Sequence, residues 1–380
     1  MKKNYCIIAL CFTVSCFSQK EVKTELQPSE RLIKFFSELV YWENIDINVS
    51  KELLYQNSDF SVAISENLIN FNVESTVLEN PYYSIDEDDE YENDYINYPV
   101  SFSVIHDDNL VSLFDNGKFV VHDIEKEQRN TELESLLNTK KFKYHWLIDN
   151  KLCALSNNKI YEWYNGKWVK LSTNFPLRKQ PVLFEDDDFI VFRDCLGEWG
   201  GTIYFFHKSS GEIYITESTC TNTVIKEGKQ YKVLSNLGHL QESTKLKIIE
   251  NPLKLTKINK REIDKKYNGH ARYTDLSGEY EEESLFGIQL LSLFDYEQKQ
   301  LFIAHIKELT FIAEIKGSKI EIVHPLFDNK LYMNEPITSS YGKHTLININ
   351  DYWRTVEREV SVIIIKDNII KKYDWNEVHD

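Results

Sequence analysis

The chain has 380 residues, of which 42% are hydrophobic and 13% aromatic, and its formal net charge is −16. This apolar content suffices for a substantial core, which excludes a globally disordered chain. A strongly acidic protein is repelled by phosphate backbones and anionic lipid, which argues against nucleic acid as a partner.

The first residues have the pattern of an export signal. Lys2 and Lys3 form a basic start, and the apolar run from Cys6 to Phe17 is too short to span a bilayer. We predict that residues 1–18 are a signal peptide and that the protein is periplasmic, on the cell surface or secreted. A lipid anchor on Cys16 is the alternative. No later segment has the length and apolarity of a transmembrane helix.

Residues 19–60 are predicted to be mainly helical. Ser29 can cap a helix that opens around Pro28. Apolar residues then recur at helical spacing on one face, at Leu32, Phe35, Phe36, Leu39 and Val40. The simplest interpretation is a helix packed on the main body, and the alternative is a partner-binding helix.

Residues 61–99 are predicted to form a connecting segment with an acidic loop. Within it, seven carboxylates crowd together: Asp86, Glu87, Asp88, Asp89, Glu90, Glu92 and Asp94. Ca²⁺ takes six to eight oxygen ligands, so Asp86, Asp88 and Glu90 are weak candidates for a metal site. A solvated surface loop is the simpler interpretation, and contact with a basic partner is a third.

From residue 100 to residue 380 the pattern changes to short apolar strands separated by Asp and Asn turns. Three stretches share one plan of strand, acidic turn, strand, turn and strand: 104–123, 146–168 and 183–215. The equivalent acidic turns fall at Asp107, Asp149 and Asp187. Asn165-Gly166 and Asn116-Gly117 are strong signals for hairpin turns.

The repeat weakens downstream but does not end. Residues 250–284 form an irregular insertion, after which strands resume with Asp295 at a comparable turn and continue to residue 375. Units of about 40–50 residues made of short strands are typical of propeller blades. The segment 60–78 is a candidate to add strands to the last blade and close the ring.

In this pattern residues 100–375 resemble the β-propeller fold. The resemblance implies an all-β ring of about six blades, with five to seven tenable, preceded by a short helical segment. A β-sandwich is the competing fold. The sequence has no Trp-Asp dipeptide, no recurring double glycine and no Ser-x-Asp-x-Gly-x-Thr-Trp box, so the resemblance is to the fold and implies no activity.

Cys195 and Cys220 bracket the hairpin predicted around residues 209–211 and are expected to form a structural disulfide in an oxidising compartment. If Phe206 pairs with Ile213, the cysteines miss strict register by four residues, which a bulge at Gly-Glu-Trp-Gly-Gly, residues 197–201, would absorb. Separate thiols or a metal site are the alternatives. The third cysteine outside the signal, Cys153, is predicted to be a buried small hydrophobe.

The glycine-rich segment also offers a weak candidate for ligand binding. Glu198 and Trp199 could form a small platform for a sugar, with the ring stacking and the carboxylate accepting hydroxyl groups. A strand connection with Trp199 packed inside is the simpler interpretation. Polar residues of the insertion, His270, Arg272 and Tyr273, are a second weak candidate, because long insertions often line binding sites.

No catalytic residue, resident metal or cofactor is predicted. The sequence has no HExxH, G-x-S-x-G, phosphate-loop or G-x-G-x-x-G motif. We therefore expect an exported binding protein that presents loops to a protein or glycan partner. The alternative is a glycan-active hydrolase or lyase with two carboxylates converging in the propeller pocket.

Overall fold

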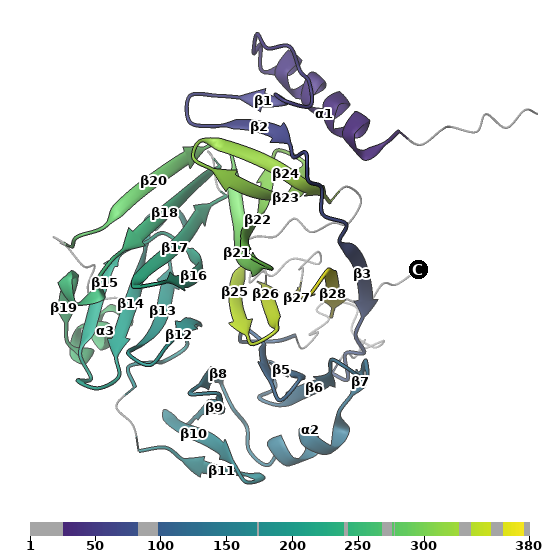
Figure 1. The fold of residues 1–380 in the computed structure, drawn as a ribbon. Coiled ribbons are helices and arrows are strands. Elements are labelled where there is room, and N and C mark those ends of the chain that lie inside the picture. Colours follow the sequence, from purple (N-terminus) through teal and green to yellow (C-terminus); the bar gives the residue numbers. More distant parts are fainter. Residues whose placement is uncertain are drawn as a thin grey trace, which may run out of the picture.

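The computed structural model describes residues 26–82, 98–172, 175–238, 242–267, 276, 278–326, 336–350 and 360–375. Within this part of the chain, six β-sheets are arranged as blades around one axis (Figure 1). The chain is a six-bladed β-propeller. The expected fold and blade number are confirmed, and the β-sandwich alternative was wrong.

The first three blades are antiparallel sheets of neighbouring strands. The first blade contains β4 (Val104–His106), β5 (Asn109–Leu113), β6 (Phe119–Asp123) and β7 (Gln128–Arg129). The second contains β8 (Tyr144–Ile148), β9 (Lys151–Ser156), β10 (Lys159–Tyr164) and β11 (Lys167–Lys170). The third contains β12 (Val182–Glu185), β13 (Phe189–Cys195), β14 (Gly201–His207), β15 (Ile213–Glu217) and, at its edge, β19 (Thr256–Ile258).

The last three blades take strands from more distant parts of the chain. The fourth contains β16 (Thr221–Glu227), β17 (Gln230–Leu237), β18 (Ser243–Ile249) and β20 (Glu281–Phe286). The fifth contains β21 (Gln289–Tyr296), β22 (Lys299–Ile306), β23 (Leu309–Lys316), β24 (Lys319–Pro325), β2 (Ser61–Ile64) and β1 (Tyr55–Gln56). The sixth contains β25 (Ile337–Tyr341), β26 (His344–Asn350), β27 (Val360–Lys366), β28 (Ile369–Asp374) and β3 (Asn72–Val77).

Apolar runs in the strands reflect burial of both faces of each blade. β5 is buried at every position and β27 at all but its last, although successive side chains point to opposite faces. In a ring, one face packs on the preceding blade and the other on the following blade. Six clusters of buried hydrophobic residues result, one at each interface between neighbouring blades.

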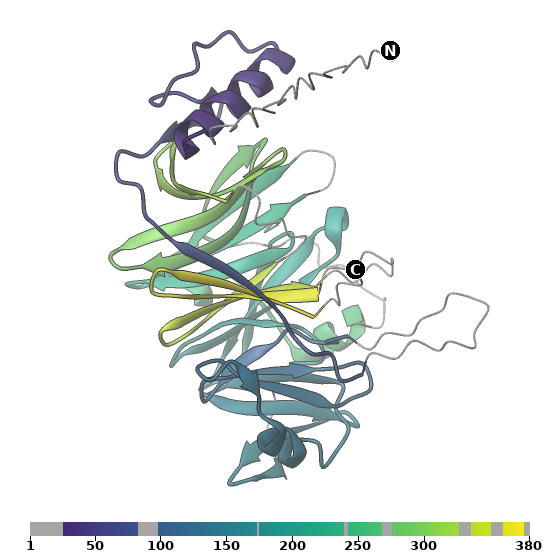
Figure 2. The same ribbon diagram turned by 90° about the vertical axis from the view of Figure 1, so that its right-hand side faces the viewer.

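The N-terminal strands extend two different blades. β2 pairs parallel with β24 of the fifth blade, and β3 pairs parallel with β28 of the sixth. Figure 2 shows this N-terminal segment running along the outside of the ring from α1 (Pro28–Trp42). The expectation that residues 60–78 add a strand to the last blade is met by β3, whereas β2 belongs to its neighbour.

The ring is closed between the sixth and first blades by side chains. Asn348 on β26 accepts a hydrogen bond from the Ser103 amide at 2.7 Å and donates one to the Ser103 carbonyl at 3.1 Å. A cluster that includes Leu110 of the first blade and Ile364 and Trp375 of the sixth fills the rest of this interface. No strand in the described ranges is shared between these two blades.

The N-terminal helix is shorter than the segment 19–60 predicted from the sequence. α1 begins at Pro28, with Gln27 rather than Ser29 at the N-cap, and Glu30 completes a capping box. Its buried face packs on the hydrophobic cluster between the fourth and fifth blades. In the described ranges no helix combines the length and the hydropathy required to cross a membrane.

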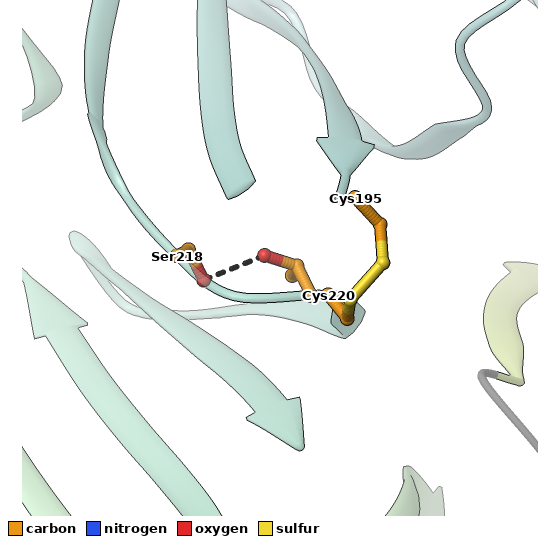
Figure 3. Close-up of a disulfide and its surroundings, with 4 residues drawn as sticks. Cys195, Ser218 and Cys220 are labelled. Atoms are coloured by element: carbon orange, nitrogen blue, oxygen red, sulfur yellow. Dashed lines mark hydrogen bonds between the residues drawn. A yellow bond between two sulfur atoms is a disulfide. The ribbon is translucent and has the colours of Figure 1, made fainter. Parts of the chain in front are cut away.

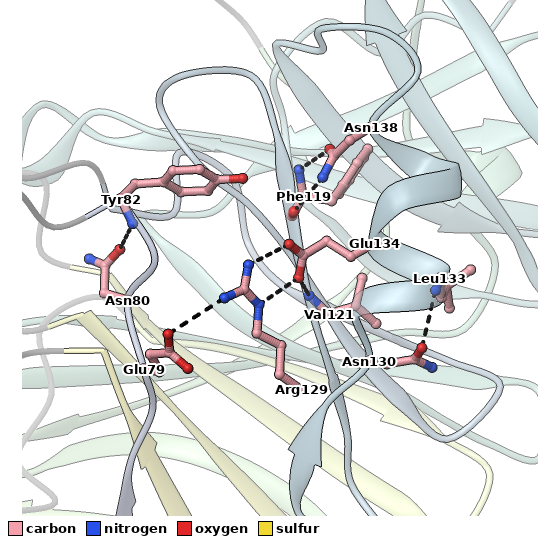
Figure 4. Close-up of polar contacts among 10 residues, drawn as sticks. All are labelled: Glu79, Asn80, Tyr82, Phe119, Val121, Arg129, Asn130, Leu133, Glu134 and Asn138. Carbon is pink, nitrogen blue, oxygen red and sulfur yellow. Dashed lines mark hydrogen bonds and ion pairs between the residues drawn. The ribbon is translucent and has the colours of Figure 1, made fainter.

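A short helix, α2 (Thr131–Leu137), packs on the first blade (Figure 4). The Glu134 side chain is buried and forms two hydrogen bonds with Arg129, at 2.9 Å from Nε and 2.5 Å from Nη2. Nη1 of Arg129 lies 3.7 Å from Glu79, just beyond β3. This contact ties the N-terminal segment to the first blade near the ring closure.

The insertion 250–284 is partly regular. It contains a short 3-10 turn (Pro252–Lys254), β19 and α3 (Lys260–Tyr267), and β19 pairs with β15 of the third blade. The chain then returns to the fourth blade as β20, whose first residue is Glu281. The insertion therefore adds β19 to the outer edge of the third blade and then supplies β20 as the outer strand of the fourth.

Candidate functional site

A pocket of about 420 Å³ lies on the propeller axis. Its walls come from the first strands of the blades, and all six blades contribute lining residues. Because these strands run in the same sense from blade to blade, the turns that follow them gather at one end of the axis. We call this end the mouth of the axial pocket; it includes the turns after β8 and β12 at Asp149 and Asp187.

Inside the pocket wall, polar side chains hydrogen-bond between blades. Thr338 of the sixth blade donates to Ser292 of the fifth at 2.8 Å. His145 of the second blade lies 3.0 Å from the Val111 carbonyl of the first and 2.6 Å from the Ser101 hydroxyl. Burial lowers the pKa of His145 to about 4, so its ring is neutral and structural at physiological pH.

The mouth is built around a lysine between two carboxylates. Nζ of Lys208, from the β14–β15 turn, lies 2.8 Å from Asp149 Oδ1 and 2.6 Å from Glu185 Oε1. The second oxygen of Glu185 accepts a hydrogen bond from the Asp149 amide at 2.9 Å. Two blades thus contribute one compact group of three charges at the pocket entrance.

The two carboxyl groups respond in opposite directions to this environment. Desolvation raises the pKa of Glu185 despite the nearby ammonium, because its side chain is only 19% exposed. The hydrogen bond from Lys208 lowers the pKa of Asp149, whose side chain is 58% exposed. Lys208 therefore holds together one half-buried carboxyl group and one exposed carboxylate.

A second charged group lies beside the first. Asp186 accepts hydrogen bonds from Lys226 Nζ at 2.5 Å and from the Tyr231 hydroxyl at 2.6 Å. Its other oxygen accepts the amides of Asp188 and Phe189, which fixes the turn after β12. These bonds to Lys226 and Tyr231 of the fourth blade anchor the third blade to its neighbour and lower the pKa of Asp186.

The mouth is acidic overall. Five carboxylates line the axial pocket, at Asp149, Glu185, Asp186, Asp187 and Asp295. The two lysines that line it, Lys208 and Lys226, leave a net charge of −3. Asp187 and Asp295 are exposed and make no ion pair that is described, so they are available to a ligand.

Replacing Lys208 by methionine should destabilise the protein by roughly 2 kcal/mol at pH 7, because the half-buried Glu185 charge loses its partner. The pKa of Glu185, already raised, should rise further, so the variant regains stability as the pH falls and Glu185 becomes protonated. Urea unfolding at pH 7 and pH 5 measures both effects. The exposed Lys254–Glu279 pair supplies the control, since Lys254→Met should change stability little at either pH. A deficit that is independent of pH would contradict this account.

The predicted disulfide is present, although its geometry differs from the predicted hairpin pair. Phe206 pairs with Ile213 as expected. Cys195, however, ends β13, whereas Cys220 lies in the β15–β16 connection, which passes the start of β14 next to Cys195 (Figure 3). The bridge therefore joins the third blade to the start of the fourth, and residues 197–199 form a 3-10 turn rather than a bulge.

Glycine at position 201 makes this bridge possible. A Cβ there would lie 2.6 Å from the Ser218 carbonyl oxygen and 2.7 Å from that of Asp194. The chain that returns toward the axis passes directly against the start of β14, next to Cys220. The second glycine of the Gly-Gly pair is thus required for close approach of the backbone.

Glu198 and Trp199 lie at the far end of β13 from the acidic turn of the pocket mouth. Trp199 is 67% exposed, which overturns the interpretation that it is packed inside. The described structure brings no second aromatic side chain into contact with it, so the sugar platform remains a prediction. Cys153 is buried and unpaired, as predicted, and desolvation raises its pKa to about 12.

Two of the predicted candidate groups lie outside the described residues. These are the acidic loop residues Asp86, Asp88 and Glu90 and the insertion residues His270, Arg272 and Tyr273. The proposed signal peptide and Cys16 also lie outside them. These predictions are neither supported nor contradicted by the structure.

The sequence identified the turns of the pocket mouth but did not show which side chains they bring together around the axis. Asp149 and Asp187 were singled out as equivalent turn residues, while Glu185, Lys208 and Lys226 were not. One available signal was the position of the acidic turns after the first strand of each repeat, which in a propeller places them around the axis. Lys208 and Lys226 lie at different positions in their blades, so the repeat pattern did not point to them.

No family model matches the chain, and no curated protein matches it. Among solved structures, it is similar to BamB from Moraxella catarrhalis (11% identity, 73% of each chain, TM-score 0.28). It is similar to the β-propeller domain of Cps50 (Swd1) from Myceliophteria thermophila (10% identity, 73% of this chain and 91% of that chain, TM-score 0.31). A protein of unknown function from Bacteroides caccae also matches (10% identity, 71% and 98%, TM-score 0.34). The assignment of the fold rests on the strand pairings of the chain itself.

Proposed function

We propose that the protein is an exported, non-catalytic binding protein that holds a positively charged segment of a partner at the mouth of its axial pocket. The observation that carries this proposal is the net charge of −3 on the pocket lining, with Asp187 and Asp295 exposed. Opposite charge at a pocket steers a basic ligand toward it and fixes its orientation. The Cys195–Cys220 disulfide supports export, because such bonds persist in oxidising compartments.

A glycan-active hydrolase or lyase is the second candidate. It is favoured by the convergence of Asp149 and Glu185 and by the opposite directions of their pKa shifts, as an acid and a nucleophile require. However, Lys208 lies within hydrogen-bonding distance of both carboxylates. An ammonium in that position occupies both carboxylates in ion pairs. This arrangement favours a structural role at the pocket mouth over proton transfer to a substrate.

Fluorescence anisotropy with a labelled tetralysine peptide at 0.15 M salt tests the proposal, with a tetraglutamate peptide as the charge control. We expect saturable binding of tetralysine that weakens by about tenfold when Asp187 and Asp295 are both replaced by asparagine, equivalent to about 1.4 kcal/mol. The matched control is the double variant Glu66→Gln and Glu132→Gln, which removes the same charge from exposed positions on the outside of the ring that do not line the pocket. Equal loss in both double variants would show that only the overall charge attracts the peptide, and the proposal would fail.

The enzyme alternative has a separate readout. Release of reducing ends or unsaturated products from a panel of polysaccharides, abolished by Glu185→Gln, would support it and contradict a non-catalytic role. Glu132→Gln, on α2 and away from the pocket, is the control that should retain any such activity.

A further inference from the structure

A second group of charged side chains lies where the first and sixth blades meet, and none of its members lines the axial pocket. Asp108 belongs to the β4–β5 turn, Glu125 to the β6–β7 turn, and His344 begins β26. One ligand atom from each of the three lies within 4.8 Å of the others. Two adjacent turns of one blade and a strand of the next therefore converge on one point.

His344 is the part of this group that surface charge does not explain. The residue is 2% exposed, and its Nε2 has no hydrogen-bond partner among the described residues. That nitrogen lies 3.9 Å from Glu125 Oε1, so it is directed at the two carboxylates. A buried polar atom left without a partner costs roughly 1–3 kcal/mol, so an unpartnered ring nitrogen directed at two carboxylates points to a ligand.

Two lysines supply positive charge to the same point in the structure. Nζ of Lys366 lies 2.6 Å and Nζ of Lys343 2.9 Å from Glu125 Oε1, and Lys343 is 3.8 Å from Asp108. The side chain of Lys343 is 52% exposed and that of Lys366 30%. Ion pairs this exposed contribute about 0–1 kcal/mol, so a more strongly bound cation can displace the ammonium groups into solvent.

We propose that Asp108, Glu125 and His344 bind a divalent transition-metal ion, and that Lys343 and Lys366 compensate the carboxylates when no metal is bound. One imidazole and two carboxylates match the nitrogen and oxygen ligands of zinc, with a fourth position left for water. Calcium and magnesium favour oxygen-only ligand sets, which this group does not offer. Such an ion would join the first and sixth blades, the interface that no strand bridges in the described ranges.

Isothermal titration of the full-length purified protein with zinc chloride tests the site. We expect one saturable site per chain, weakened by at least about tenfold in Asp108→Asn and in Glu125→Gln, because even outer-shell changes at metal sites cost about that much. Asparagine tolerates the positive φ of 56° at position 108, and both side chains are exposed, so these variants should fold. Exposed Glu132 gives the matched control, since Glu132→Gln should bind zinc as the wild type does.

Removing one of the two lysines should change the zinc affinity in the opposite direction. Lys343→Met should bind zinc more tightly than wild type, by about tenfold if its ammonium competes for Glu125, whereas Lys316→Met on the fifth blade should not. Zinc should also raise the melting temperature of the wild type, by an amount that grows with the logarithm of the free zinc concentration above Kd. Absence of saturable binding to the wild type, or binding unchanged by Asp108→Asn and Glu125→Gln, would overturn the proposal.

Discussion

Replacing Asn348 by alanine should destabilise the protein by about 4 kcal/mol, which is the largest effect we expect from a single substitution. Asn348 is 1% exposed and bonds both the amide and the carbonyl of Ser103 across the ring closure. Alanine would leave two backbone groups without partners, each at a cost of roughly 1–3 kcal/mol, and would add a small cavity. Equilibrium urea unfolding gives the difference directly.

Asn222 is the matched comparison for this change. It is also buried and also bridges two blades, but it makes one described hydrogen bond, from Nδ2 to the Leu290 carbonyl at 2.8 Å. Asn222→Ala should therefore cost clearly less than Asn348→Ala, although both remove the same atoms. Equal losses would mean that cavity formation alone governs the cost and that the closure has no special dependence on Asn348.

The ring was predictable because each blade is buried on both faces. A strand between two neighbouring blades carries continuous apolar residues, as β27 does with Val-Ile-Ile-Ile at positions 362–365. Asp and Asn turns at regular intervals then mark the blade boundaries. In the turns after β4 and β8, both central residues have positive φ, such as 49° at Asp107 and 50° at Asp149, which Asp and Asn tolerate better than most residues.

The added outer strands were harder to predict because little of their surface is buried. β3 reads Asn-Val-Glu-Ser-Thr-Val, and none of its positions is fully buried. Its partner, β28, lies almost 300 residues later, and parallel pairing of its backbone leaves no periodic signal in the sequence. β19 was hard to predict for another reason, because it is only three residues long and pairs antiparallel with a strand of an earlier blade.

The charged sites depend on which blades are neighbours, and single-chain spacing does not contain that information. Lys208 reaches Asp149 from the following blade. Glu125 and His344 meet only because the ring brings the first blade against the last. Sequence motifs report ligands a few residues apart, whereas these groups form only once neighbouring blades have packed together.

Replacing both Cys195 and Cys220 by serine should lower the free energy of unfolding by about 3 kcal/mol, the value expected for a cross-link that closes a loop of 25 residues. The loop it closes holds β14 and β15 of the third blade, so its loss should also loosen the connection into β16. Urea unfolding under oxidising conditions measures the difference.

Treatment with a reducing agent separates the effect of losing the disulfide from any effect of the two new serine hydroxyl groups. It should destabilise the wild type by the same amount as the double substitution and leave the double variant unchanged. Cys153→Ala should retain the full response to the reductant, because Cys153 is buried and unpaired. A wild type that is insensitive to complete reduction would show that the close packing of Gly201 against Ser218 and Asp194, rather than the covalent bond, holds the third blade to the fourth.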